Sequence, residues 1–303
     1  MIQQHHLFAL CLALSSSAAA QSFAGGDLSN SPGPYGIPPD QVFDAAQVPN
    51  SYLTVPINGY NTSIPAGPAI GTADTLPGWT LAIGVSANVP LAGADAPGVD
   101  AHSFMQMTAL SVTPPAELDT PDYKEGDWRV CAIVFTGGLL KGVNGTGTGR
   151  GTADDGGCGG WLPQGCIGQL QARSVAVAGN ASVGGCVGME VPEVCKGYFG
   201  EGKGVAYEVS PSDDGNARIF FAAGSAPFTH RGNQTLLAAA EDAVWPLVLT
   251  WSHLGQSGAV HDSQGWLSCV RSGGGDAPSA GSRALVGGSI WALLMAGAVM
   301  LVL

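Results

Sequence analysis

Frequent glycine and proline residues limit the length of any regular element that this chain can form. The 303 residues include 46 glycines and 20 prolines, together more than a fifth of the sequence. Glycine weakens helices and strands because it has the most backbone freedom to lose, and proline cannot donate a backbone hydrogen bond. Short apolar runs of six to ten residues lie between these breaks. The runs are Ser51–Ile57, Trp79–Ala87, Ser103–Val112, Trp128–Thr136, Gly204–Val209, Ala217–Ala223, Trp245–His253 and Gly265–Arg271.

These runs are rich in valine, isoleucine, tryptophan and phenylalanine, which favour strands. Several short strands with frequent turns predict an all-β fold, here a single sandwich-like domain with long Gly/Pro-rich loops. The Asp-Asp-Gly triplet at 213–215 predicts a hairpin turn between two of the runs. Three short segments have helical character instead: Pro163–Val175, a segment that begins at Pro192, and Leu236–Ala243.

Low charge and an acidic balance exclude several classes of protein. Charged residues make up 11% of the chain and the formal net charge is −12. A helical bundle needs many more Glu, Lys and Arg residues, and an acidic chain repels the phosphates of nucleic acid. The glycine-rich run 145–151 lacks the G-x-G-x-x-G spacing and the G-K-[ST] motif of phosphate-binding loops. We therefore expect no nucleic-acid partner, no nucleotide and no cofactor.

Residues 1–20 have the features of a secretory signal peptide. An apolar run from Leu7 to Leu14 is followed by small residues, with Ala18 and Ala20 at the A-x-A positions before Gln21. An apolar run of this length is too short to span a bilayer. We expect cleavage after Ala20.

The other end has the layout of a glycosylphosphatidylinositol (GPI) attachment signal. The small residues Ser272, Gly273 and Gly274 are followed by a polar spacer, Gly275–Arg283, and by an uncharged apolar segment, Ala284–Leu303. A small-residue site, a spacer of eight to twelve residues and an apolar tail direct attachment of this lipid. We expect removal of 273–303, with the lipid on Ser272, Gly273 or Gly274. The alternative is a retained single transmembrane helix.

The expected mature chain carries six cysteines once Cys11 is removed with the signal peptide. An even number of cysteines in a secreted chain predicts disulfides, here three bonds with fifteen possible connectivities. Four of the six fall within 158–195, which favours local pairing, and we expect the distant Cys131 and Cys269 to pair. The spacing contains no C-x-x-C, so we expect no metal site. The six are Cys131, Cys158, Cys166, Cys186, Cys195 and Cys269.

Four N-x-S/T sequons predict glycosylated, exposed loops, and they begin at Asn61, Asn144, Asn180 and Asn233. With both terminal signals and the cysteines, this arrangement resembles the GPI-anchored cell-surface and cell-wall glycoproteins of filamentous fungi. The chain differs from many of them in lacking a long Ser/Thr-rich stalk. The resemblance implies display on the extracellular face of the plasma membrane or in the cell wall, with the lipid in the outer leaflet and cell-wall glycan as a partner. It includes no catalytic domain family.

The mature chain divides into two parts by composition. Residues 21–50 are rich in Gly, Pro and Asn without periodicity, which predicts an extended N-terminal arm. Residues 51–272 contain the strand-like runs and form the β-rich, disulfide-bonded domain.

Two kinds of residue are candidates for chemistry or binding. Glycosidases use a pair of carboxylates, and Asp122 and Asp127 in the acidic cluster 119–127 are the candidates for such a pair. Aromatic rings stack on sugars, but the alternating Trp245 and Trp251 more often mark a buried core face. Tyr35, Tyr52 and Tyr60 lie in loop-rich sequence and are the better candidates for exposed rings.

Two functions are therefore open. The first is a non-catalytic surface glycoprotein, displayed through a GPI anchor and binding cell-wall glycan. The second is a GPI-anchored cell-wall glycan hydrolase or transglycosylase with an acid pair.

Overall fold

A computed structural model describes most of the chain between Ser22 and Gly273. It describes residues 22–25, 28, 31–63, 70–71, 74–115, 118, 128–135, 157–180, 185–199, 203–209, 218–255 and 259–273, referred to below as the described residues. The strands are β1 (Ser22–Gly25), β2 (Ser51–Pro56), β3 (Gly59–Tyr60), β4 (Thr75–Leu76), β5 (Thr80–Pro90), β6 (Phe104–Thr113), β7 (Trp128–Phe135), β8 (Met189–Glu190), β9 (Lys203–Glu208), β10 (Arg218–Gly224), β11 (Trp245–Leu254) and β12 (Val260–Val270). The α-helices are α1 (Pro39–Gln47), α2 (Gln164–Asn180), α3 (Lys196–Phe199) and α4 (Gln234–Asp242), and the short 3-10 helices are η1 (Pro34–Gly36) and η5 (Glu193–Cys195).

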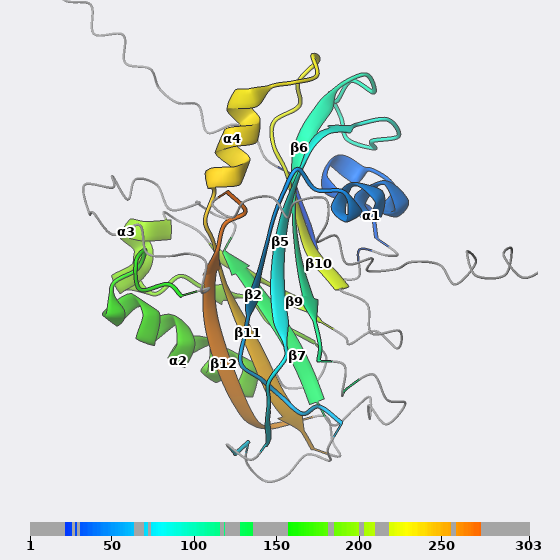
Figure 1. Cartoon of the computed structure of the whole chain (residues 1–303). Helices are drawn as coiled ribbons and strands as arrows, with labels where there is room; N and C mark the ends of the chain where they lie inside the picture. Colours follow the sequence, from blue (N-terminus) through cyan, green and yellow to red (C-terminus); the bar gives the residue numbers. More distant parts are fainter. Residues whose placement is uncertain are drawn as a thin grey trace, which may run out of the picture.

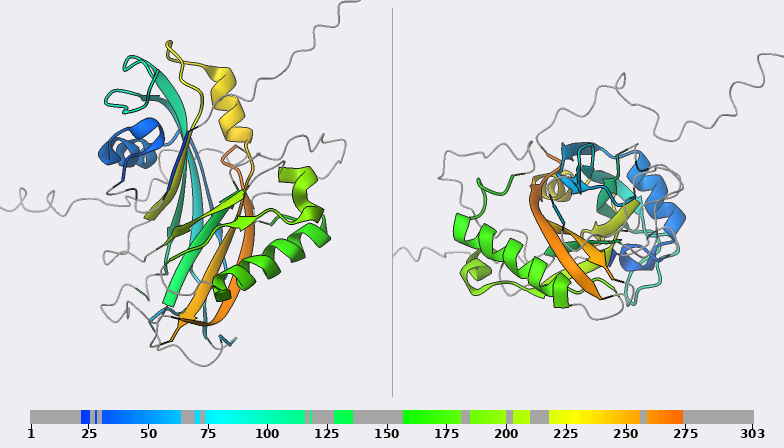
Figure 2. Two further views of the ribbon diagram at one scale, coloured as in Figure 1. Left: turned by 180° about the vertical axis from the view of Figure 1, so that it is seen from behind. Right: turned by 90° about the horizontal axis from the view of Figure 1, so that it is seen from below.

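The described strands form two five-stranded antiparallel sheets and one small two-stranded ribbon. The first sheet has the order β1-β10-β6-β5-β2, and the second has the order β12-β11-β7-β9-β8. The ribbon pairs β3 with β4. The two sheets curl around a common core, with helices outside them (Figures 1 and 2). The predicted all-β, sandwich-like fold with short helices and disulfides is confirmed.

The core between the sheets follows from the alternation of side chains along each strand. Inward residues of β5 and β6, such as Leu81 and Leu110, meet those of β11, such as Leu249 and Trp251. Successive residues of a strand point to opposite faces, so one face of each strand supplies this core. On the outer face of each sheet, a helix covers part of the surface.

Each outer face has its own apolar cluster. Behind the second sheet, Cys166 and Leu170 of α2 pack with Val248 and Leu267 of the strands. Behind the first sheet, α1 places the buried Val42 against the methionines and alanines of β6 and β10. Figure 2 shows α1 and α2 on opposite sides of the strands. The double coverage explains why every residue of β11 is buried.

The prediction of an extended arm over 21–50 is wrong for the described part of that segment. Residues Ser22–Gly25 form β1, which pairs with β10 at the edge of the first sheet. Pro39 opens α1, and proline suits the first turn of a helix because its missing N–H has no helical partner there. The folded domain therefore begins at β1, and not at residue 51.

The predicted pairing of Cys131 with Cys269 is also wrong. The disulfides join Cys131 to Cys186, Cys158 to Cys269, and Cys166 to Cys195. In the second sheet, Cys131 lies on β7 and Cys269 lies on β12. Strand β11 separates these two strands. Adjacent strands lie about 4.8 Å apart, so cysteines two strands apart exceed the reach of a disulfide. The expectation of local pairing holds for Cys166 and Cys195.

All eight predicted runs contain strands, and the three helical segments contain α2, η5 with α3, and α4. The predicted hairpin at 213–215 is wrong, because β9 belongs to the second sheet and β10 to the first. The triplet itself lies outside the described residues. Between β9 and β10 the chain passes from the second sheet to the first.

Candidate functional site

The two acids predicted as a catalytic pair, Asp122 and Asp127, lie outside the described residues. Asp127 directly precedes Trp128, the first residue of β7. The acidic segment therefore leads directly into the start of β7.

The tryptophans of β11 belong to the core. Trp245 is 2% exposed and Trp251 is fully buried, and both pack between the sheets. Neither ring can stack on a sugar from solvent, so the core alternative is the correct one. β11 is an interior strand of the second sheet. Pro246 is tolerated because it is the second residue of the strand, and pairing with β7 starts only at Leu247.

The three tyrosines differ in exposure. Tyr35 fastens the N-terminal segment: its hydroxyl donates to the Ser225 carbonyl over 2.9 Å, and the Ser22 hydroxyl accepts its backbone N–H over 2.9 Å. Tyr60 packs against the core. Tyr52, on the edge strand β2, is 37% exposed, so of the three it presents the most accessible ring.

A group of aromatic and ionisable side chains gathers where β7 begins and β11 ends. The rings of Trp128 and His253 lie 3.8 Å apart between centroids in an edge-to-face arrangement. Tyr60 stacks on Trp128 and meets Trp251 edge-on. His253 is 1% exposed, and neither of its ring nitrogens has a hydrogen-bond partner among the described residues. The alternation of β11 places His253 on the same inward face as Trp251, a signal that was present in the sequence.

Two carboxylates lie near Tyr60 and organise the neighbouring backbone. Asp262, which faces His253 across the β11–β12 pair, accepts the N–H of Ile70 over 2.8 Å. Asp74 accepts the N–H of Gly71 over 2.7 Å. Burial raises the pKa of Tyr60 above its usual value, and the charges of Asp262 and Asp74 raise it further. His253 is thus sealed from solvent, and both carboxylates are engaged by backbone N–H groups.

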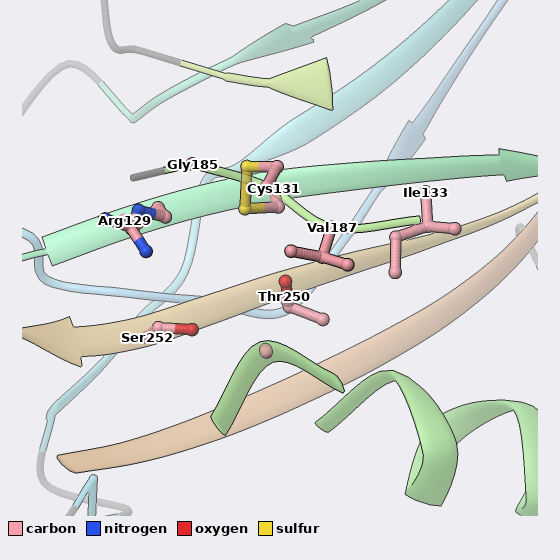
Figure 3. A pocket seen from close by; sticks show the side chains of 9 residues that line it. Arg129, Cys131, Ile133, Gly185, Val187, Thr250 and Ser252 are labelled. Carbon is pink, nitrogen blue, oxygen red and sulfur yellow. A yellow bond between two sulfur atoms is a disulfide. The ribbon is translucent and has the colours of Figure 1, made fainter. Parts of the chain in front are cut away.

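A small cavity lies behind the second sheet, under the segment that carries Cys186 (Figure 3). Its polar lining comes from Arg129, Thr250 and Ser252, and the Cys131–Cys186 disulfide forms one wall. One guanidinium nitrogen of Arg129 and the hydroxyl of Thr250 have no hydrogen-bond partner among the described residues. The volume is about 10 Å³, room for one water molecule and not for a sugar ring.

The sequons occupy different settings. Asn61 follows β3, and its side-chain oxygen accepts the N–H of Ser63 over 3.1 Å. Asn180 is the last residue of α2, and the rest of its sequon lies outside the described residues. Asn233 caps α4, where its side-chain oxygen accepts the N–H of Leu236. Asn144 lies outside the described residues.

Two of the three candidate lipid-attachment residues belong to the folded domain. Ser272 is fully buried and accepts a hydrogen bond from the Ser51 hydroxyl over 3.0 Å. Gly273 donates its N–H to the Glu241 carbonyl over 2.7 Å. Gly274 lies outside the described residues.

Comparison with protein-family models, with curated proteins and with solved structures gives no match. Within the described ranges, no cluster of three or more His, Cys, Asp or Glu side chains is arranged to hold a metal ion. No helix in the same part of the chain is both long and apolar enough to cross a membrane.

Proposed function

We propose that this chain is a non-catalytic secreted surface glycoprotein, displayed through a GPI anchor on the outer leaflet or in the cell wall. The supporting observation is that the described contacts reach from Ser22 to Gly273, close to both expected processing sites. β1 begins at Ser22, two residues after the expected signal cleavage, and the last described backbone contact is made by Gly273. The expected mature segment, residues 21–272, therefore includes nearly all of the described sandwich.

The proposed partner is cell-wall glycan, which is abundant at that location. Tyr52 is the candidate contact, because its ring is accessible on an edge strand while Trp245 and Trp251 are buried. Flat aromatic rings stack on the apolar faces of sugars, and an exposed tyrosine also offers a hydroxyl for hydrogen bonding. The hydrolase alternative depends on Asp122 and Asp127, and no contact among the described residues favours it.

Phosphatidylinositol-specific phospholipase tests the anchor. Treatment of membranes from cells expressing the full chain should move the protein to the aqueous phase. Retention in the detergent phase, with the segment Ala284–Leu303 intact by mass spectrometry, would contradict the proposal.

A glycan array tests the partner. The released protein should bind cell-wall polysaccharide, and Tyr52→Ala should weaken binding by about tenfold, since one ring stacking is worth about 1 kcal/mol or more. Phe43→Ala is the matched control, because Phe43 is an equally exposed ring on α1. Release of soluble sugar from wall glucan, abolished by Asp122→Asn or Asp127→Asn, would instead establish the hydrolase.

A further inference from the structure

The outer face of the second sheet brings four side chains together around the small cavity described above. In the pairing of β7 with β11, Cys131 lies opposite Thr250 and Arg129 lies opposite Ser252. Residues directly opposite in an antiparallel pair share a face, with their Cβ atoms about 5 Å apart. Residues two apart on one strand share a face as well. The register of the two strands therefore places all four side chains around one space (Figure 3).

A disulfide holds a cover over this space. Cys131 is joined to Cys186, and the neighbours Gly185 and Val187 also line the cavity. Ala178, in the last turn of α2, closes another side. The cavity thus lies between the sheet, a disulfide-linked segment and the end of a helix.

Two polar atoms at this cavity are buried without a partner. The Nη1 atom of Arg129 and the hydroxyl of Thr250 have no hydrogen-bond partner among the described residues. Neither of the two ion pairs between described residues includes Arg129. A guanidinium group only donates hydrogen bonds, and a hydroxyl has one proton to donate. The hydroxyls of Ser252 and Ser263 are paired, and when Ser263 donates, the proton of Ser252 is free as a third donor.

The charge around the cavity favours an anion over a water molecule. Arg129 carries a full positive charge, and none of the described residues that line the cavity is a carboxylate. The C-terminal end of α2 brings about half a negative charge near Ala178, which offsets only part of it. Glu208, opposite Cys131 on β9, is exposed, so water and salt screen its charge. A water molecule would accept the same hydrogen bonds and leave the positive charge uncompensated.

We propose that this cavity binds a single chloride ion, held by Arg129, Thr250 and Ser252 under the Cys131–Cys186 disulfide. The volume of about 10 Å³ admits a monatomic ion and excludes phosphate, sulfate and the carboxylate of a sugar acid. The ion gives both unpartnered donors an acceptor and connects β7 with β11. A ligand that binds only the folded state stabilises it by mass action, so chloride stabilises this protein. The site depends neither on the anchor nor on a glycan partner.

Replacement of one anion by another tests the stabilisation. The purified protein is unfolded by heat in about 0.15 M sodium methanesulfonate, which is exchanged stepwise for sodium chloride at constant ionic strength. Methanesulfonate screens surface charges equally but is too large for the cavity. We expect the Tm to rise by about 3 °C or more and then to level off as the site fills. An equal Tm in the two salts would overturn the proposal.

Arg129→Gln tests the position of the ion, because it removes both the charge and the principal donor. The rise in Tm caused by chloride should fall to less than about one fifth. Arg173→Gln is the matched control: Arg173 is exposed on α2 and does not line the cavity, so the full rise should remain. A full rise in Arg129→Gln would overturn the site.

Thr250→Val keeps the shape of the side chain and tests the second donor independently. Without halide the Thr250 hydroxyl has no partner, so in methanesulfonate the variant should be at least as stable as the wild type. Chloride should raise its Tm by about half as much as that of the wild type or less. A full rise in this variant would exclude Thr250 as a ligand and overturn the proposed site.

Chlorine NMR detects the bound ion directly. Exchange of chloride between solution and an asymmetric protein site broadens its resonance. The broadening by the wild type and by Arg173→Gln should exceed that by Arg129→Gln by about threefold or more, since only the last lacks the cation of the site. Equal broadening by all three proteins would show that the cavity holds water alone, and the proposal would be overturned.

Discussion

Thr250 lies in the middle of the second sheet with a buried hydroxyl that has no hydrogen-bond partner among the described residues. Burying an unpaired hydroxyl costs about 1–3 kcal/mol, whereas valine has nearly the same shape and no polar atom. Thr250→Val should therefore leave the free energy of unfolding unchanged or raise it by about 1 kcal/mol. Urea unfolding monitored by tryptophan fluorescence measures this.

Ser252, two residues further along the same face of β11, is the matched control. Its hydroxyl is paired with that of Ser263 at 2.8 Å. Ser252→Ala should lower the free energy of unfolding by about 1 kcal/mol, because it leaves the partner hydroxyl unpaired. If Thr250→Val were as destabilising as Ser252→Ala, the Thr250 hydroxyl would have a partner in solution, such as water in the neighbouring cavity.

Tyr60 links stability to alkaline pH. Burial, followed by the charges of Asp262 and Asp74, raises its pKa above 10.0 in the folded state. The contribution of the neutral Tyr60 side chain to the free energy of unfolding is complete below the pKa of the unfolded state. It is lost as the pH rises through the pKa of the folded state. The wild-type protein should thus lose stability above about pH 10. In Tyr60→Phe, this loss should be shallower by up to about 1.4 kcal/mol per pH unit.

Urea unfolding of both proteins from pH 7 to pH 11 measures the effect. The difference at pH 7 gives the packing contribution of the hydroxyl and is subtracted from the values at higher pH. Parallel curves above pH 10 would show that Tyr60 does not resist ionisation in the folded protein. Tyr35 and Tyr207 also have raised pKa values, so the variant should keep part of the alkaline loss.

At the scale of elements, the strands could be predicted because their signals are local. Each apolar run is bounded by turn residues, and both features are read within about ten positions. The helix α1 escaped prediction because its nine residues, PDQVFDAAQ, lie within a segment rich in Gly, Pro and Asn, and only Val42 among them is buried. Its proline at the first turn was the available signal.

The partners of the strands could not be predicted, because pairing depends on contacts between distant residues. β9 and β10 are consecutive in sequence, yet they lie in different sheets. The same limit applies to Cys131, whose partner Cys186 comes from the segment that crosses behind the second sheet. Spacing alone does not distinguish this pairing from the fourteen other connectivities.

The three disulfides differ in access, which predicts the order of their reduction. Cys186 is half-buried, whereas Cys166 and Cys195 are fully buried behind α2. Thiol–disulfide exchange requires a thiolate to reach one sulfur. Under a mild reductant at neutral pH, we expect alkylation of Cys131 and Cys186 first, measured by peptide mass spectrometry. In guanidinium chloride the order should disappear, and earlier labelling of Cys166 in the native protein would contradict the prediction.

At the scale of the molecule, the predicted terminal signals would leave residues 21–272. The described contacts run from Ser22 to Gly273. The sequence could not establish Asp122 and Asp127 as a catalytic pair, and both lie outside the described residues. A catalytic reading needs the distance between two carboxyl groups, which no local pattern in a sequence contains.

The C-terminal limit of the domain can be tested by truncation. A chain of residues 21–273 keeps the Ser51–Ser272 hydrogen bond and the bond from Gly273 to Glu241, whereas a chain of residues 21–271 loses both. Each hydrogen bond contributes about 1 kcal/mol, so the free energy of unfolding of the shorter chain, measured in urea, should be about 2 kcal/mol lower. Ser51→Ala in the longer chain removes only the hydroxyl pair and should cost about half as much. Equal stability of the two chains would show that the contacts of Ser272 and Gly273 do not stabilise the domain.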